Sequence, residues 1–109
     1  MFKMLLTTQN QFSDYEIIQT LGLVKGNTVR ARHAGKDILA TFRNVVGGEI
    51  EEYTKLLAES REQAIDRMIE MAKTMGADGI VGIRFTTSSI MQAASEMFVY
   101  GTAVKLKKK

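Results

Sequence analysis

The alternation of apolar and polar side chains is clearest between Glu51 and Phe85. Glu51–Met75 contains neither glycine nor proline, and its apolar residues recur at steps of three, four and seven. This spacing predicts an α-helix with one apolar stripe. The stripe consists of Tyr53, Leu57, Ala64, Ile65, Met68, Ile69, Ala72 and Met75. Gly76 can adopt the left-handed conformation that ends a helix, and the β-branched segment Gly79–Phe85 then predicts a buried strand.

Strand patterns precede this helix. Phe2–Thr8 and Tyr15–Lys25 are predicted strands. Gly26-Asn27 is a good two-residue turn, which would return the chain as a third strand over Thr28–Arg32. The alternative is one long strand with a bulge at Gly26.

The C-terminal part predicts a second pair of strands. Gly79–Phe85 can extend through Met91, and a turn at Gln92–Ser95 would lead to a last strand, Glu96–Leu106. The two faces of the last strand differ in size. Phe98, Tyr100, Thr102, Val104 and Leu106 form the larger face, and Met97, Val99, Gly101 and Ala103 form the smaller. Glycine inside a strand suggests close approach of another element, a ligand or a second subunit, so Gly82 and Gly101 are candidate oligomer-interface positions.

A second, shorter helix is predicted over Asp37–Val46, whose apolar residues also follow a helical period, and Gly47-Gly48 ends it. The order of elements is therefore β-β-β-α-α-β-β. It predicts an α+β fold in which a mostly antiparallel sheet packs on one long and one short helix.

Length and composition narrow the class of protein. A chain of 109 residues is a single domain, residues 1–109. A domain of this size buries only about 60–65% of its unfolded surface, so it gains stability from oligomerisation. The absence of cysteine excludes disulfides and thiolate metal sites and fits a reducing cytoplasm. No apolar run is long enough to span a membrane, and the first residues lack a secretory signal, so we expect a cytoplasmic protein without a membrane partner.

The formal net charge is +3, and Lys105, Lys107, Lys108 and Lys109 contribute four of the fifteen basic residues. We interpret this lysine tail as a solvated end that keeps an exposed strand from pairing with other chains. Weak nucleic-acid binding is the alternative. We do not favour it, because the tail lacks the interleaved aromatic residues on which bases stack.

Candidate chemistry lies mainly around the short helix. His33 is the only histidine, so one chain lacks the ligands of a tetrahedral zinc site, and His33 is a weak metal candidate. Arg32 and His33 precede a helix start and could hold an anion, or could lie on an exposed strand edge. The junction Arg43–Glu49 resembles no phosphate-loop pattern, and a helix junction is favoured over a binding loop there. Met68 and Met75 fall on the buried stripe, where core packing is favoured over a copper site.

Several stretches resemble one known family. Gly26–His33, Arg43–Ile50, Gly76–Phe85 and Tyr100–Val104 are similar to the YbjQ-like family of small bacterial proteins, and the resemblance covers nearly the whole chain. That family is assigned to heavy-metal binding by its description, without an established activity. The resemblance implies a dodecin-subunit-like α+β fold and a ring of five subunits.

The resulting hypothesis is a cytoplasmic homo-oligomer without catalysis of its own, which binds a metal ion or a small ligand between subunits. The ligand-binding residues would be Arg32, His33, Arg43, Asn44, Gly47, Gly48 and Glu49. A scaffold that binds partner proteins without a ligand is the second hypothesis. An enzyme that uses Glu49 or His33 as a general acid or base is the third. The cofactor stays open between a metal ion and an organic ligand.

Overall fold

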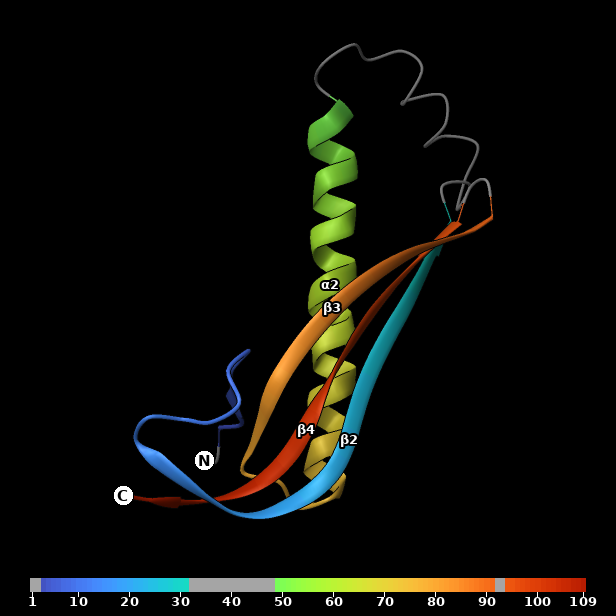
Figure 1. The fold of residues 1–109 in the computed structure, drawn as a ribbon. Helices are drawn as coiled ribbons and strands as arrows, with labels where there is room; N and C mark the ends of the chain where they lie inside the picture. The colour runs from blue at the N-terminus through green and yellow to red at the C-terminus, as the bar shows by residue number, and fades with distance from the viewer. Residues whose placement is uncertain (1–2, 32–48, 92–93) are drawn as a thin grey trace.

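A computed structural model describes residues 3–31, 49–91 and 94–109. Five elements follow one another along the chain (Figure 1): β1 (Leu5–Leu6), β2 (Tyr15–Ala31), α2 (Glu49–Thr74), β3 (Gly79–Met91) and β4 (Ala94–Lys108). The strands form one sheet in the order β1-β3-β4-β2.

The α+β class is confirmed, and the sheet is mixed. β4 pairs with β2 and β3 in antiparallel register, whereas β1 adds a parallel edge to β3. The predicted first strand is reduced to two residues, Leu5–Leu6. The predicted short helix over Asp37–Val46 and the turn residues 92 and 93 lie outside the described residues.

The predicted hairpin turn at Gly26-Asn27 is wrong, because β2 runs straight through both residues and stays paired with β4. The reason is tertiary. A Cβ atom at Gly26 would overlap the carbonyl oxygen of Ala64 and lie 2.6 Å from the amide nitrogen of Met68. Glycine is therefore needed at this position because the backbone of α2 approaches the strand closely, not because the chain turns.

The alternative of a single long strand is correct, but its irregularity does not lie at Gly26. The β2–β4 register shifts between Ile17 and Gln19 and again between Thr20 and Gly22. Gly22 has a φ of 134°, a conformation that favours glycine. The strand is therefore irregular in its first half and regular where α2 packs on it.

The long helix is confirmed over nearly the predicted range, and its C-terminal end follows from hydrogen bonding. Gly76 has a φ of 78°. The amide of Gly76 donates to the Lys73 carbonyl (3.0 Å), and the amide of Ala77 donates to the Ala72 carbonyl (3.1 Å). This pair of bonds is the Schellman arrangement, which satisfies carbonyls that the helix leaves without partners.

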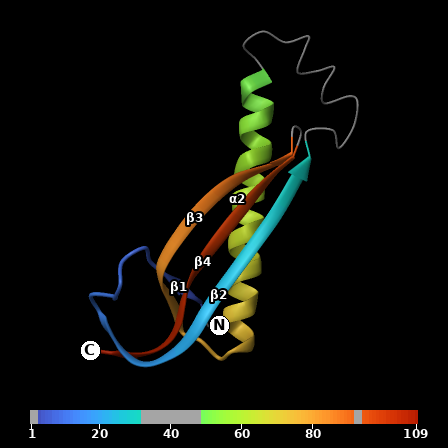
Figure 2. The ribbon, with the colours of Figure 1, turned by 45° about the vertical axis from the view of Figure 1, so that its right-hand side comes forward.

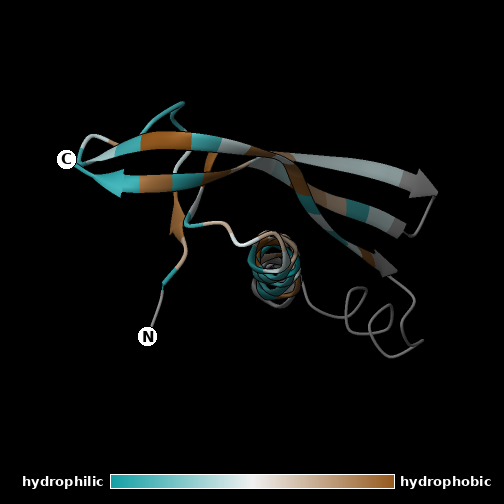
Figure 3. Cartoon of the chain, turned by 90° about the horizontal axis from the view of Figure 1, so that it is seen from below, coloured by the Kyte–Doolittle hydropathy of each residue, from teal (hydrophilic) through white to brown (hydrophobic). Residues whose placement is uncertain are grey.

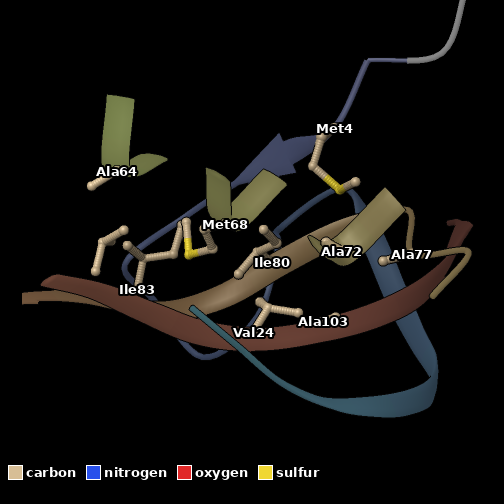
Figure 4. Close-up of a cluster of buried hydrophobic side chains, with 10 residues drawn as sticks. Met4, Val24, Ala64, Met68, Ala72, Ala77, Ile80, Ile83 and Ala103 are labelled. Atoms are coloured by element: carbon tan, nitrogen blue, oxygen red, sulfur yellow. The ribbon is translucent and has the colours of Figure 1, made fainter. Parts of the chain in front are cut away.

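The core lies between α2 and one face of the sheet (Figure 4). Its buried members are Met4, Val24, Ala64, Met68, Ala72, Ala77, Ile80, Ile83, Val99 and Ala103. The predicted helix stripe is confirmed for Ala64, Met68 and Ala72, which are fully buried. The pattern missed Ser60, a fully buried polar residue whose carbonyl accepts a hydrogen bond from the Thr28 hydroxyl at 3.1 Å.

The molecule is elongated rather than compact. Its extents are 55 × 24 × 23 Å and its radius of gyration is 17.3 Å, whereas a compact domain of this length has about 13 Å. Figures 1 and 2 show why: the long strands cross α2 at an angle, and their ends near residues 31, 91 and 94 lean away from it. In the described part of the chain, no helix is long and apolar enough to cross a membrane.

Candidate functional site

The predicted ligand-binding residues fall almost entirely outside the described part of the chain. These are Arg32, His33, Arg43, Asn44, Gly47 and Gly48. Glu49 is the first residue of α2, where a negative charge interacts favourably with the helix dipole. Ligand binding by these residues therefore stays a prediction.

Glycine at the two positions predicted to lie at an oligomer interface, Gly82 and Gly101, is explained by the structure of a single chain. Gly82 has a φ of 63° and lies in the register shift of β3 between Val81 and Arg84. A Cβ atom at Gly101 would lie 2.7 Å from the Ile80 side chain, so this glycine makes room for the neighbouring strand. Contact with a second subunit at either glycine stays a prediction.

A heavy-metal site needs several ligating side chains close together. Among the side chains that the structure describes, which do not include those of residues 49–54, no group of three or more His, Cys, Asp or Glu could hold a metal ion. Met68, considered as a soft-metal ligand, is fully buried in the core. A site with three such ligands must therefore include other side chains of this chain, such as that of His33, or residues of a second chain.

Asp78 forms hydrogen bonds through its carboxylate and through its backbone. Its Oδ2 atom accepts the Leu106 amide hydrogen at 2.9 Å. Its own amide donates to the Val104 carbonyl, and its carbonyl accepts from the Leu5 amide. Asp78 therefore joins β1, β3 and β4, and its carboxylate has a structural role.

An apolar groove separates α2 from the β3 side of the sheet. Its volume is about 410 Å³, and it is lined by Leu6, Thr7, Thr8, Ile65, Met68, Ile83 and Phe85. Phe85 pairs with Val99, which places it on the helix-facing side of the sheet. α2 packs on β2 and β4, so Phe85 remains 47% exposed and Leu6 40% exposed. Apolar side chains therefore form most of the exposed lining of the groove.

The N-terminal segment holds one wall of this groove in place. The Thr7 amide donates to the Ile80 carbonyl (3.1 Å), and the Ile83 amide donates to the Thr7 carbonyl (3.2 Å). Arg84 Nη1 donates to the Thr8 carbonyl at 2.7 Å. These bonds extend the pairing beyond β1 and fix Leu6 beside β3. The lining of the groove is thus held by backbone bonds, and it consists of apolar residues and two threonines.

The groove is not visible in local sequence patterns. Strand patterns place Leu6 and Phe85 in strands but do not distinguish the side of the sheet that a helix covers from the side that it leaves open. The apolar stripe of the helix contains one indication of the groove. It includes Ile65 and Ile69 beside Ala64 and Met68, so it is wider than contact with two strands requires. Both isoleucines are half-buried.

Comparisons with known proteins agree on one family. A family model named YbjQ, with the description "Putative heavy-metal-binding", matches residues 4–107. A UPF0145 protein of Methanococcus vannielii is 55% identical over 105 residues, which are 96% of this chain and 100% of the relative. A UPF0145 protein of Pseudothermotoga lettingae is 58% identical over 96% of this chain and 99% of its own.

A solved structure has a similar fold. It is a protein of unknown function from Pediococcus pentosaceus, assigned to the DUF74 family. The TM-score is 0.65 at 17% sequence identity, and the match covers 95% of this chain and 98% of the other. At this identity the likeness concerns the fold alone.

Proposed function

The chain belongs to the YbjQ-like family, and from this premise we propose that it is a cytoplasmic homo-oligomer that binds a metal ion or small ligand between its subunits. It has no catalytic activity of its own in this proposal. The single observation that carries the association is the apolar groove between α2 and β3, which the described part of one chain leaves open.

Two flanks of the molecule support a head-to-tail arrangement. The groove lies on the β3 flank. On the opposite flank, β2 is the edge strand of the sheet, and Met71 of α2 is 40% exposed near it. Arg67, one turn before Met71, donates to the Asn27 carbonyl of β2 at 2.6 Å. Contact between two different flanks closes into a ring when the rotation between subunits permits it. A ring of five subunits is what the family resemblance implies.

The shared ligand site follows from the residue inventory. The chain has one histidine and no cysteine, and the described residues hold no cluster of metal ligands. Ligands drawn from several subunits would bring copies of His33 together with Arg32, Arg43, Asn44, Gly47, Gly48 and Glu49. This arrangement reconciles a metal-binding family with a chain that is poor in metal ligands.

The association is tested with Phe85→Asp, which places a charge in the groove. Native mass spectrometry of untagged protein, purified without chelator, should show an oligomer of the wild type and a smaller species for the variant. Tyr100→Asp is the matched control, because Tyr100 of β4 is 36% exposed and belongs neither to the groove nor to the β2 edge. A monomeric wild type, or equal assembly of both variants, would contradict the proposed interface.

The ligand site is tested separately with Zn²⁺ and Cu⁺ as probes. Bound metal is counted on the wild type and on His33→Ala and Arg43→Ala/Asn44→Ala. We expect these variants to lose the metal and to keep their assembly. If they dissociate instead, the residues are structural. If the wild-type oligomer binds neither metal and carries no additional mass, the alternative of a ligand-free scaffold is favoured.

A further inference from the structure

Two aromatic side chains project from the face of the sheet that α2 does not cover. Val99 and Gly101 of β4 face the helix, so the intervening Tyr100 and its neighbour Phe98 point to the opposite side. Figure 3 shows α2 on one side of the sheet only. The centroids of the Phe98 and Tyr100 rings are 5.6 Å apart and their planes are inclined by 34°. They form a short aromatic column on the open face.

Basic side chains flank this column on both neighbouring strands. Tyr100 pairs with Lys25 on β2 and with Arg84 on β3, so the three residues form one row across the sheet. Lys25 and Arg84 are both exposed. The next row, Asn27–Phe98–Thr86, is polar on both sides of its aromatic ring. The Tyr100 ring therefore lies between two cationic side chains, and the Phe98 ring lies between two side chains that can form hydrogen bonds.

Neither Lys25 nor Arg84 forms an ion pair within the described part of the chain. The ion pair there joins Lys73 and Glu70. Arg84 Nη1 donates to the carbonyls of Thr8 (2.7 Å) and Ile83 (2.8 Å). These neutral partners hold the guanidinium at the β3 side without cancelling its charge. The nearest carboxylate on the face, Glu96, is one row beyond Phe98 and accepts a hydrogen bond from Asn27 Nδ2 at 3.0 Å.

We propose that this open face binds single-stranded nucleic acid. Bases stack on Phe98 and Tyr100, and the phosphates interact with Lys25 and Arg84. Proteins that bind single strands without strong sequence preference combine stacking aromatics with a basic track in this manner. Sheet faces with exposed aromatics serve the same purpose in RNA-binding domains. Further along β4, the exposed Lys108 alternates to the same side as Tyr100.

Charge complementarity favours a polyanion over a second copy of the chain. A face-to-face contact between two copies would bring the Lys25 and Arg84 side chains of both together, and Glu96 lies one row beyond Phe98 on this face. A nucleic-acid strand supplies one negative charge per nucleotide. The inference goes beyond the proposed function, because it uses a different surface from the apolar groove.

The sequence alone argued against nucleic acid, since the lysine tail lacks interleaved aromatic residues. In the structure the interleaving runs across strands instead of along one. Lys25, Tyr100 and Arg84 are far apart in the sequence, and only the register of β2, β4 and β3 brings them into one row.

The test measures fluorescence anisotropy of a labelled oligouridine of about ten nucleotides, within the site sizes of single-strand binders. We expect binding by the wild type at low salt, weakened as salt rises. Phe98→Ser/Tyr100→Ser should weaken it at least about fivefold, because each stacked base is lost. Tyr100→Phe keeps the ring and should bind normally.

Charge is tested independently with exposed lysines. Lys25→Glu should weaken binding and reduce its salt dependence, whereas Lys55→Glu on α2 should leave both unchanged. Circular dichroism confirms that each variant is folded.

Three results would overturn the inference. The first is no binding by the wild type at low salt. The second is binding that survives loss of both rings but disappears when the lysine tail is removed. The third is dissociation of an oligomer by Phe98→Ser/Tyr100→Ser, which would make this face a subunit interface. Failure of the proposed metal-binding oligomer would appear in the Phe85→Asp and His33→Ala experiments and would leave the anisotropy result unchanged.

Discussion

The two faces of the sheet are made by the same strands and have opposite character. On the covered face, Gly26, Gly101 and Ala103 lie under or beside α2 and carry little or no side chain. On the open face, the alternate positions carry Lys25, Phe98 and other large residues. The size of the side chains therefore depends on the neighbouring element. Small residues are needed where the helix backbone comes close to the sheet, and large residues fit on the face that the helix leaves open.

The covered face is stabilised by more than apolar contact. Where α2 crosses β2, the Thr28 hydroxyl donates to the Ser60 carbonyl, and the Ser60 hydroxyl donates to the Leu56 carbonyl at 3.0 Å. Both Thr28 and Ser60 are buried. Buried polar groups without partners would destabilise the fold, so these bonds explain how small polar residues fit between a helix and a sheet.

The largest effect is expected at Gly26. Gly26→Val would drive the side chain into the backbone of α2 at Ala64 and Met68, which cannot move aside as a side chain could. We expect a loss of at least about 4 kcal/mol in the free energy of unfolding, at the upper end of overpacking effects. Urea denaturation at one subunit concentration measures it. Lys25→Val, the neighbouring residue on the open face, should change stability by less than about 1 kcal/mol. Equal effects of the two variants would contradict the close approach of α2.

An intermediate effect is expected for a core methionine. Met68 is fully buried, whereas Met71, three residues later on α2, is 40% exposed. Met68→Ala should cost about 3 kcal/mol through lost burial and a residual cavity. Met71→Ala should cost less than about 1 kcal/mol in unfolding of the subunit. Thermal unfolding of both variants would check the contrast, and a larger loss for Met71→Ala would indicate that its flank is buried in the assembly.

The smallest effect on stability is expected on the open face. Tyr100 is 36% exposed, and its ring lies beside that of Phe98 on the open face. Tyr100→Thr replaces an aromatic residue by a β-branched one, and both types favour strands, so the free energy of unfolding should change by no more than about 1 kcal/mol. Urea denaturation beside the wild type provides the measurement. A loss comparable with that of Met68→Ala would mean that another layer covers this face.

Much of the fold could be predicted from residue patterns. The period of the apolar stripe predicted α2, and Gly76 predicted its end, because both signals are local. The Gly26-Asn27 turn was predicted wrongly for the same reason. A glycine beside an asparagine looks like a turn in isolation, but the helix backbone that requires this glycine comes from residues 64–68, almost forty positions away.

The candidate sites were less accessible to sequence reasoning. The residues selected by motif, such as His33 and Arg43, remain hypotheses outside the described ranges. The groove depends on which strands α2 covers, and the row through Tyr100 depends on which residues are paired across β2, β4 and β3. Neither kind of information is contained in local spacing.

Residue patterns are sufficient for the elements whose signals lie within a few residues of one another: the helix, its cap, and the strand Gly79–Met91. The continuity of β2, the parallel edge at β1, and the division into covered and open faces follow from contacts between distant segments. The physical reason is distance along the chain. Helical periods and caps involve neighbours within about one turn, whereas strand register and helix-on-sheet packing join residues that meet only after the chain has folded.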